Sequence, residues 1–274
     1  MDFRLRLHMF LRSFFLQAGW NYVKYQNLGF AFVMLPFLRK LYHQDPDTLS
    51  AIIKRRYLDT FNTHPVMASF CYGALAKQEE IIAKAAPLTD YKEQVNEWMG
   101  IRRGLSITAA SIGDRLFWGT LKPLTLLLAI FLWLLFGINF FETATLQPVS
   151  NWYIFLPLVL IFLIYNCVAW YVRWKGIELG YQADETTCFG LTRFDWNRTI
   201  YHTKRVGLVF TSALIVFGVY YYFSQIPQID LRFITHAVLV LCCVLLAFIA
   251  RYLRIPNVYL YIIAVVVFNI VCLF

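Results

Sequence analysis

The second half of the chain contains five long apolar runs, none of which carries an Asp, Glu, Lys or Arg. The runs cover residues 124–141, 152–172, 206–223, 233–250 and 258–274. Each is close to the ~20 residues that a helix needs to cross about 30 Å of hydrocarbon. Only helices or closed barrels satisfy the backbone in lipid, and continuous apolar runs lack the alternation of a barrel strand. We therefore expect an all-α integral membrane protein with about five transmembrane helices.

The composition supports this class. Of the 274 residues, 59% are hydrophobic and 15% are charged, whereas soluble domains carry about 25% charged residues. The formal charge is +9, and residues 1–123 hold 16 Lys+Arg against 10 Asp+Glu. Basic loops beside a membrane contact anionic lipid, so we expect anionic lipid as a partner and no nucleic acid.

The loops between the runs predict an orientation. Residues 142–151 carry no Lys or Arg, whereas residues 173–205 carry six. Because basic loops stay in the cytoplasm, the N-terminus should be cytoplasmic and the C-terminus outside. Tryptophan and tyrosine gather at the ends of the runs, as in an interfacial aromatic belt.

The first half differs, and we treat residues 1–123 as a separate region from the bundle at 124–274. Phe3, Leu7, Phe10 and Phe14 share one helical face, which indicates an interfacial helix. The apolar stretches 28–38 and 65–76 are too short to span and suit re-entrant segments. Residues 77–103 are polar and helix-prone, and residues 106–120 are broken by Gly-Asp at 113–114. Interrupted apolar pieces of this kind line substrate paths in transporters.

No signature of catalysis is present. The chain lacks the P-loop, dinucleotide, serine-hydrolase and zinc-protease motifs. Its six cysteines have no zinc spacing, and its five histidines are scattered. The start of the chain lacks the pattern of a cleavable signal peptide. We expect no catalytic residue, no metal site and no cofactor.

Asp114 is the first candidate for a functional residue. It lies in the nearly uncharged stretch ITAASIGDRLFWGT, and an ionisable group at membrane depth is costly enough to suggest a function. Two structural explanations compete with this. Asp114 could pair with Arg115 or Lys122, or it could cap a helix that starts at Leu116.

Asn21, Gln26 and Asn62 form a second candidate set. Each is an uncharged amide in apolar, aromatic surroundings. Sugar sites combine such amides with aromatic faces, because hydroxyls need donors and acceptors while the ring packs on an aromatic side chain. The same amides also satisfy interrupted helix ends, and the sequence leaves both explanations open.

Three stretches together identify a family. Residues 10–42, 57–80 (with FNTHP and a closing EE) and 100–123 (with GD..FWGTLKP) resemble, in order and spacing, the IID membrane component of the mannose/fructose/sorbose-type sugar phosphotransferase system. The segment RWKGIELGY at 173–181 resembles the same family more loosely. The resemblance covers essentially the whole chain.

The resemblance implies a transporter subunit of the bacterial cytoplasmic membrane. Family members pair with a IIC membrane subunit, assemble as hetero-oligomers of several IIC–IID pairs, and pass a hexose to IIA and IIB proteins. Those partners carry the phosphoryl group on histidines, so this chain would not be an enzyme. The sugar lies at the IIC–IID interface, which implies substrate-pathway roles for the residues that match: Asn21, Gln26, Asn62, Asp114 and Trp118.

The chain also departs from the family pattern. Val23 stands where an acidic residue is usual. Residues 105–115 read LSITAASIGDR where the family reads LMGPLAGIGDP or LMGPLAGIGDS, so the Gly-Pro pair is replaced by Ile107-Thr108. These changes suggest altered gating or substrate, or a paralogue that regulates or scaffolds without transporting. A third alternative is a membrane enzyme that uses Asp114 and Asn62 on a lipid or polyprenyl substrate.

Overall fold

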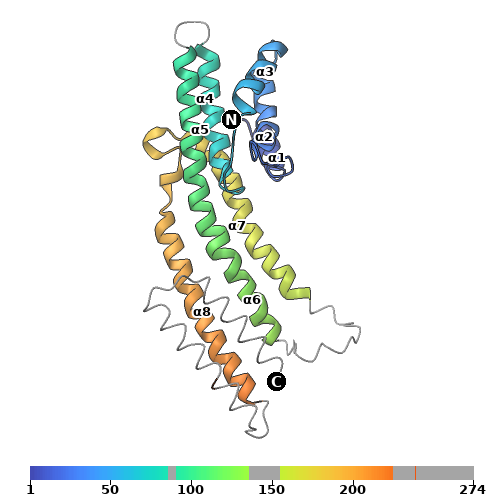
Figure 1. Ribbon diagram of the computed structural model, residues 1–274, viewed down its shortest axis with the longest axis vertical. Coiled ribbons are helices and arrows are strands. Elements are labelled where there is room, and N and C mark those ends of the chain that lie inside the picture. The colour runs from blue at the N-terminus through green and yellow to red at the C-terminus, as the bar shows by residue number, and fades with distance from the viewer. Residues whose placement is uncertain (86–90, 136–154, 225–237, 239–274) are drawn as a thin grey trace. The chain divides into compact units, whose positions relative to one another are not determined.

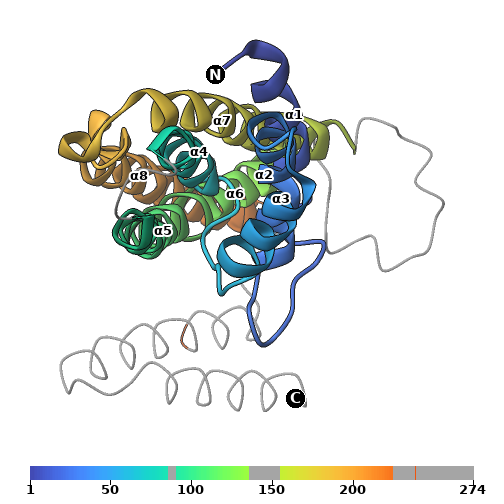
Figure 2. The ribbon, with the colours of Figure 1, turned by 90° about the horizontal axis from the view of Figure 1, so that it is seen from above.

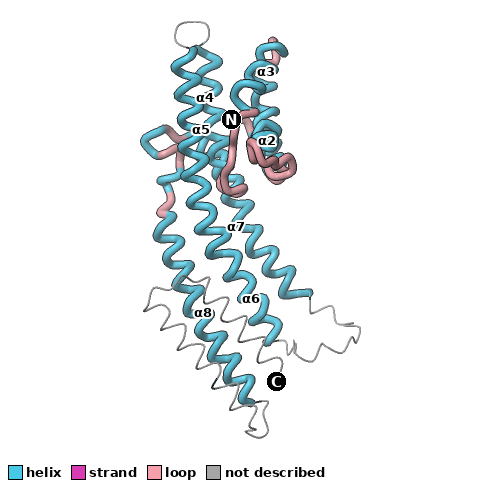
Figure 3. The backbone as a smooth tube through the Cα atoms, viewed as in Figure 1, coloured by secondary structure: helices cyan, strands magenta, loops and turns pink. Residues whose placement is uncertain are grey.

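The computed structural model describes residues 1–85, 91–135 and 155–224, together with Val238 (Figure 1). Within these ranges the regular structure is helical, without a strand, and isolated bridges join Tyr25 to Asn21 and to Phe61. The predicted all-α class is therefore confirmed (Figure 3). The chain divides into two compact units, residues 1–212 and 213–274, and the contacts described below lie in the first.

Four short helices form the N-terminal part. They are α1 (Phe3–Ser13), α2 (Asn27–Leu41), α3 (Pro46–Ile52) and the π-helical η1 (Ile53–Tyr57). The start of α3 follows from its sequence. Asp45 Oδ1 accepts a hydrogen bond from the Thr48 N–H at 2.9 Å, and Pro46 occupies the first turn.

The predicted N-terminal helix is confirmed as α1, but its most buried residues are not the predicted aromatic ones. Leu5 and Met9 are buried, whereas Phe3 and Phe10 are only partly covered or exposed. Phe3 and Phe10 meet the Trp174 ring edge-on, with ring centroids 5.6 and 5.5 Å away. The aromatic face of α1 thus rests on a neighbouring helix, and its placement in a membrane interface stays a prediction.

A long, continuous helix follows. After α4 (Ala68–Ala85), the chain runs through α5 (Tyr91–Gly113), the π-helical η2 (Asp114–Leu121) and α6 (Lys122–Leu135) without interruption. The predicted break at Gly113-Asp114 is therefore wrong. Gly113 keeps right-handed helical angles, φ −63° and ψ −45°. The wider π-helical turns then carry the chain from α5 to α6, and the Lys122 N–H bonds to Phe117 O five residues earlier.

The length of this helix exceeds the thickness of a membrane. The candidate span Glu93–Trp133 contains 41 residues, which at 1.5 Å per residue is about 60 Å. Hydrocarbon is only about 30 Å thick. Part of α5 must therefore extend beyond the apolar layer, and this agrees with the polar sequence predicted as solvated at 77–103.

The remaining helices are α7 (Phe155–Gln182) and α8 (Trp196–Ser224), joined through short 3₁₀ turns at Glu185–Thr187 and Leu191–Arg193. Helix α4 packs on both α5 and α7 (Figure 2). The approach to α7 is close at Gly73, where a Cβ atom would collide with the backbone of Ile177 and Tyr181. Small residues permit such close packing of membrane helices.

A buried polar network joins the N-terminal helices to α4. The Glu79 carboxylate is fully buried and forms an ion pair with Arg56. It also accepts hydrogen bonds from the hydroxyls of Tyr42 at 2.8 Å and Tyr57 at 3.0 Å. A buried carboxylate requires this degree of pairing, so the network fixes α2 and η1 against α4.

Arg102 on α5 makes a second connection. Its guanidinium donates to the carbonyl oxygens of Arg56, Asp59 and Thr60 at 3.0, 2.7 and 2.8 Å. It also lies 5.2 Å from the ring centroid of Phe30. Because these carbonyls lie at and beyond the end of η1, Arg102 anchors the following loop to α5.

Two described helices are long and apolar enough to cross a membrane, Glu93–Trp133 and Phe155–Gln182. They contain parts of the first two predicted spans, and the predicted span 206–223 falls within α8. The predicted spans 233–250 and 258–274 lie outside the described residues. The count of five spans therefore stays a prediction, as do the orientation and the boundary at residue 123.

Candidate functional site

The candidate site is built around the 58–67 loop, which connects η1 to α4 and runs along α5. Gln26 holds this loop from one side: its Nε2 donates to Thr63 O at 2.9 Å, and its Oε1 accepts from Thr63 N–H at 3.0 Å. From the other side, Thr63 Oγ1 donates to Ser106 O at 2.9 Å. All three residues are buried. The loop is therefore fixed to two helices at Thr63.

His64, the residue after Thr63, also attaches the 58–67 loop to the long helix. Its ring stacks on Phe117 with centroids 5.1 Å apart and meets Trp118 edge-on at 4.9 Å. The imidazole lies against Gly113, where a Cβ atom would collide with the ring. Absence of a side chain at Gly113 thus allows the loop to approach the junction of α5 and η2.

Asn62, Asp114 and Trp118 lie at this junction and are exposed. Asn62 is two residues before His64, and Asp114 follows Gly113, so the contact between His64 and Gly113 brings their segments together. Among the described residues, no hydrogen bond or ion pair engages the side chain of Asn62 or Asp114. Both polar groups are therefore available to a ligand or a partner.

The two structural explanations for Asp114 are wrong. The helix runs through Asp114, so this residue caps no helix start. Arg115 instead donates to Asn197 Oδ1 at 3.2 Å, and in the described part of the chain neither Arg115 nor Lys122 forms an ion pair with Asp114. The sequence alone could not decide whether the Asp114 carboxylate is paired or unpaired. Within the described part of the chain it is unpaired.

Asn21 and Gln26 occupy a different position from the other three predicted residues. Asn21 Nδ2 donates to Asn27 Oδ1 at 2.9 Å, and its Oδ1 accepts from the Lys24 N–H at 2.8 Å. Gln26 is committed to Thr63. The observed roles of both amides are supporting ones, in the turn that precedes α2, and a pathway role for them stays a prediction.

His64 is a residue that sequence reasoning passed over. Burial, and secondly the nearby positive charge of Arg173, lower the pKa of His64 to about 4. The imidazole is therefore neutral at physiological pH. Its only sequence signal was its place in FNTHP. Arg173 gave a weaker signal, as one of several basic residues that follow an apolar run.

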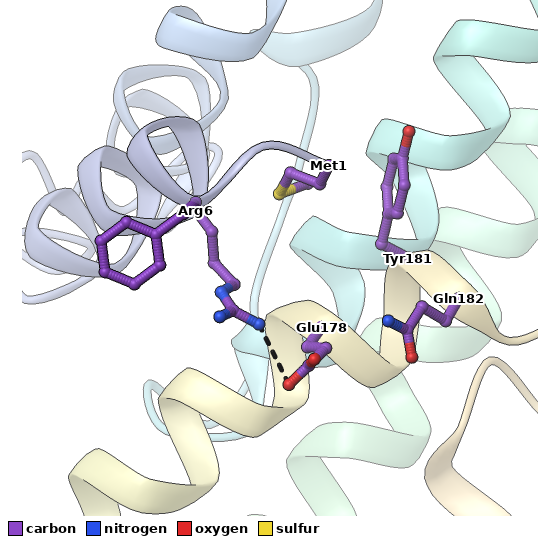
Figure 4. Close-up of a pocket in the computed structure, with 6 residues that line it drawn as sticks. Met1, Arg6, Glu178, Tyr181 and Gln182 are labelled. Atoms are coloured by element: carbon purple, nitrogen blue, oxygen red, sulfur yellow. Dashed lines mark ion pairs between the residues drawn. The ribbon is translucent and has the colours of Figure 1, made fainter.

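A separate cavity of about 220 Å³ lies between the start of α1 and the end of α7 (Figure 4). There Arg6 forms an ion pair with Glu178 at 3.0 Å, and its guanidinium lies 4.1 Å from the centroid of the Trp174 ring. These contacts fasten α1 to α7. The cavity shares no lining residue with the candidate site. Among the described residues, no group of three His, Cys, Asp or Glu side chains is arranged to hold a metal ion.

Comparison with known proteins shows which family the chain resembles. Residues 3–137 match the sequence model of the PTS system mannose/fructose/sorbose family IID component. The chain is 33% identical to the PTS system sorbose-specific EIID component of Klebsiella pneumoniae and 34% identical to the mannose-specific EIID component of Escherichia coli strain K12. The resemblance to the IID component is confirmed.

The matches to these IID relatives are partial. They cover 64% and 63% of this chain, and 55% and 53% of the two relatives. The IID-like chain thus spans about half the length of those relatives, and the family model covers its residues 3–137. The 58–67 loop and the α5–η2 junction both fall inside the matched residues.

Two solved structures are similar to the IID-like chain. A structure described as a membrane protein is 28% identical, with a TM-score of 0.62, and covers 78% of this chain and 70% of its own. The mannose transporter ManYZ, solved with microcin E492, has a TM-score of 0.55 at 22% identity, covering 98% and 95%. The second likeness shows a shared fold.

Proposed function

We propose that this chain is the IID-like membrane subunit of a phosphotransferase-system permease, and that with a IIC partner it forms the translocation path for a mannose-type hexose. The single observation that carries the proposal is the junction of the 58–67 loop with η2. There an amide, a carboxylate and an indole are each exposed, and among the described residues the amide of Asn62 and the carboxylate of Asp114 have no hydrogen bond or ion pair.

The chemistry of this junction suits a sugar. Asp114 accepts hydrogen bonds, Asn62 both donates and accepts, and the half-exposed Trp118 offers an aromatic face. Hydroxyl groups need such mixed partners, while the apolar face of a sugar ring packs on an aromatic side chain. Related proteins carry mannose-specific, sorbose-specific and fructose-permease names, which supports a hexose.

The outer surfaces support partners within a membrane. Helix α7 exposes large apolar side chains along its length, including Phe155, Phe162 and Ile164. Such a surface suits lipid or another membrane subunit. We propose that a IIC subunit covers part of it in a hetero-oligomer of the bacterial cytoplasmic membrane, with anionic lipid around the rest. Phosphoryl transfer would belong to IIA and IIB proteins.

Sugar uptake tests the proposal. In cells that supply the IIC, IIA and IIB partners, Asn62→Ala and Asp114→Asn should each lower uptake at least tenfold while the protein still inserts. Asn96→Ala and Glu97→Gln are matched controls, because both residues are exposed on α5 away from the junction. Uptake that survives both junction variants would remove the site assignment.

A regulatory or scaffolding role is the second candidate, and one observation favours it. Ile107 and Thr108, which replace the family's Gly-Pro pair, lie exposed on an unbroken α5. A proline there would remove a helical hydrogen bond and kink the helix. If an unbroken helix prevents transport, the chain should bind IIC normally while uptake stays at background, and Thr108→Pro with Ile107→Gly should restore it.

A further inference from the structure

A second cavity, of about 210 Å³, lies between the 58–67 loop, η2, α7 and the segment that follows α1. Its lining includes His64, Trp118, Tyr165, Asn166, Trp170 and Arg173. The walls thus hold several aromatic rings, and their polar side chains are nitrogen donors together with two amides, Gln17 and Asn166, and one phenol. This composition defines the class of ligand that the cavity can take.

Arg173 supplies a positive charge that the described part of the chain does not neutralise. Its Nη1 donates to Ser13 O at 2.8 Å and to Ser13 Oγ at 3.2 Å, and the guanidinium lies 4.9 Å from the centroid of the Phe14 ring. Arg173 is 9% exposed, and no described Asp or Glu forms an ion pair with it. A nearly buried cation without a counter-charge is costly, so an anion at this place would be stabilising.

His64, which lines the same cavity, carries an unused donor. Its Nδ1 accepts from the Val66 N–H at 3.3 Å, so the proton of the neutral ring is on Nε2. Nε2 is buried and has no hydrogen-bond partner among the described residues. A buried donor without an acceptor costs about 1–3 kcal/mol. The missing partner of His64 is therefore an acceptor.

The position of the cavity along α7 points to the source of the anion. The uncharged run 155–172 ends at Arg173, the first charged residue of the helix, and Trp170 and Trp174 lie on either side of it. Tryptophan and arginine at the end of an apolar run mark the headgroup level of a bilayer. At that level the abundant anion is a phospholipid phosphate.

We propose that this cavity binds the phosphate group of an anionic phospholipid, with Arg173 and the Nε2–H of His64 as donors and with Trp170 against the glycerol and the first acyl carbons. A neutral sugar would leave the charge of Arg173 uncompensated. The site goes beyond the proposed transport function, because it would bind lipid whether or not the chain carries sugar.

Thermal unfolding of the purified full chain in a neutral detergent tests this site. A ligand of the native state raises Tm according to its affinity and concentration. Phosphatidylglycerol should raise the Tm of the wild type and of the control Arg205→Gln, an exposed cation on α8, by the same amount. With lipid at about 100 times the wild-type Kd, the shift in Arg173→Gln and His64→Phe should fall to less than half, which at that concentration corresponds to an affinity lower by at least about tenfold.

Two further ligands distinguish a phospholipid from a free anion. Phosphatidylcholine with the same acyl chains should give at most half of the shift that phosphatidylglycerol gives, and inorganic phosphate at millimolar concentration should give none. An equal shift with inorganic phosphate would assign the site to a free anion and overturn the lipid proposal. Equal shifts with phosphatidylglycerol in the wild type and both cavity variants would overturn the site itself.

The His64→Phe variant guards against a folding artefact. Phenylalanine keeps the ring that packs on Phe117 and Trp118 but removes the Nε2–H. If Arg173→Gln fails to fold because Ser13 loses its donor, His64→Phe still decides the question. After gel filtration, phosphorus analysis should find more bound lipid on the wild type and on Arg205→Gln than on His64→Phe.

Discussion

Gly113 on the long helix lies directly against the imidazole of His64, and no Cβ atom fits between them. This contact determines where the 58–67 loop meets α5, and therefore where Asn62 and Asp114 are presented. A single methyl group at position 113 should separate the two segments.

Gly113→Ala should lower the free energy of unfolding by about 1–3 kcal/mol, the usual cost of overpacking. The matched control is Gly104→Ala on the same helix, where nothing lies within 4 Å of the added Cβ. There alanine should stabilise the helix by up to about 1 kcal/mol. Thermal unfolding in detergent measures both, and a Tm of Gly113→Ala at or above that of the wild type would contradict the contact.

Gln26→Ala should destabilise the protein by about 2–4 kcal/mol, because it leaves the buried N–H and C=O of Thr63 without partners. Gln44→Ala, an exposed glutamine after α2, should change stability by less than about 0.5 kcal/mol. Limited proteolysis supplies a second measurement: cleavage within residues 58–67 should speed up in Gln26→Ala alone. Equal stability of the two variants would show that Gln26 does not hold the loop.

Glu79→Gln should cost about 3–5 kcal/mol, since it leaves Arg56 buried beside a neutral amide. The adjacent Glu80 is a built-in control. It is partly exposed and pairs with Lys77 and Lys84, and such surface pairs contribute about 0–1 kcal/mol. Chemical unfolding of Glu79→Gln and Glu80→Gln side by side should therefore separate them clearly, and a similar midpoint for both would refute the structural role of Glu79.

The lowered pKa of His64 predicts a dependence of stability on pH. Histidine in the unfolded chain titrates near 6.5, whereas the pKa of folded His64 is about 4. Between these values the unfolded state binds more protons, so stability should fall as pH decreases from about 6.5 towards 4, by up to about 1.4 kcal/mol per pH unit.

His64→Phe isolates that contribution, because every other group titrates equally in both proteins. The Tm of the wild type relative to that of His64→Phe should therefore be lower at pH 5 than at pH 7. A constant difference across this range would show that folded His64 titrates normally.

Sequence reasoning could find the features that depend on local pattern. The uncharged run at 152–172 predicts a membrane helix because its length and composition alone satisfy the bilayer, and α7, which contains residues 155–172 of it, has those properties. The helical spacing of Phe3, Leu7, Phe10 and Phe14 near the N-terminus likewise predicts α1 from local pattern alone. Neither inference requires knowledge of what lies nearby in space.

The rest depends on contacts between distant residues. Glu79 has partners more than twenty positions away, and Arg102 contacts carbonyls more than forty positions away. No periodicity in one sequence reveals such pairs. The predicted helix break at Gly113-Asp114 was wrong for a related reason. Gly-Asp is common in turns, but here Gly113 makes room for the His64 ring and the helix continues through it.

The uninterrupted helix from Glu93 to Trp133 has a mechanical consequence. A rod of this length joins the polar start of α5 to the apolar α6 without an intervening hinge. A force applied by a protein that binds the start of α5 would therefore arrive at Asp114 and Trp118 as a rotation or a shift of the whole rod. The π-helical turns from Asp114 to Leu121 are the segment where such a motion could be taken up as a change of winding.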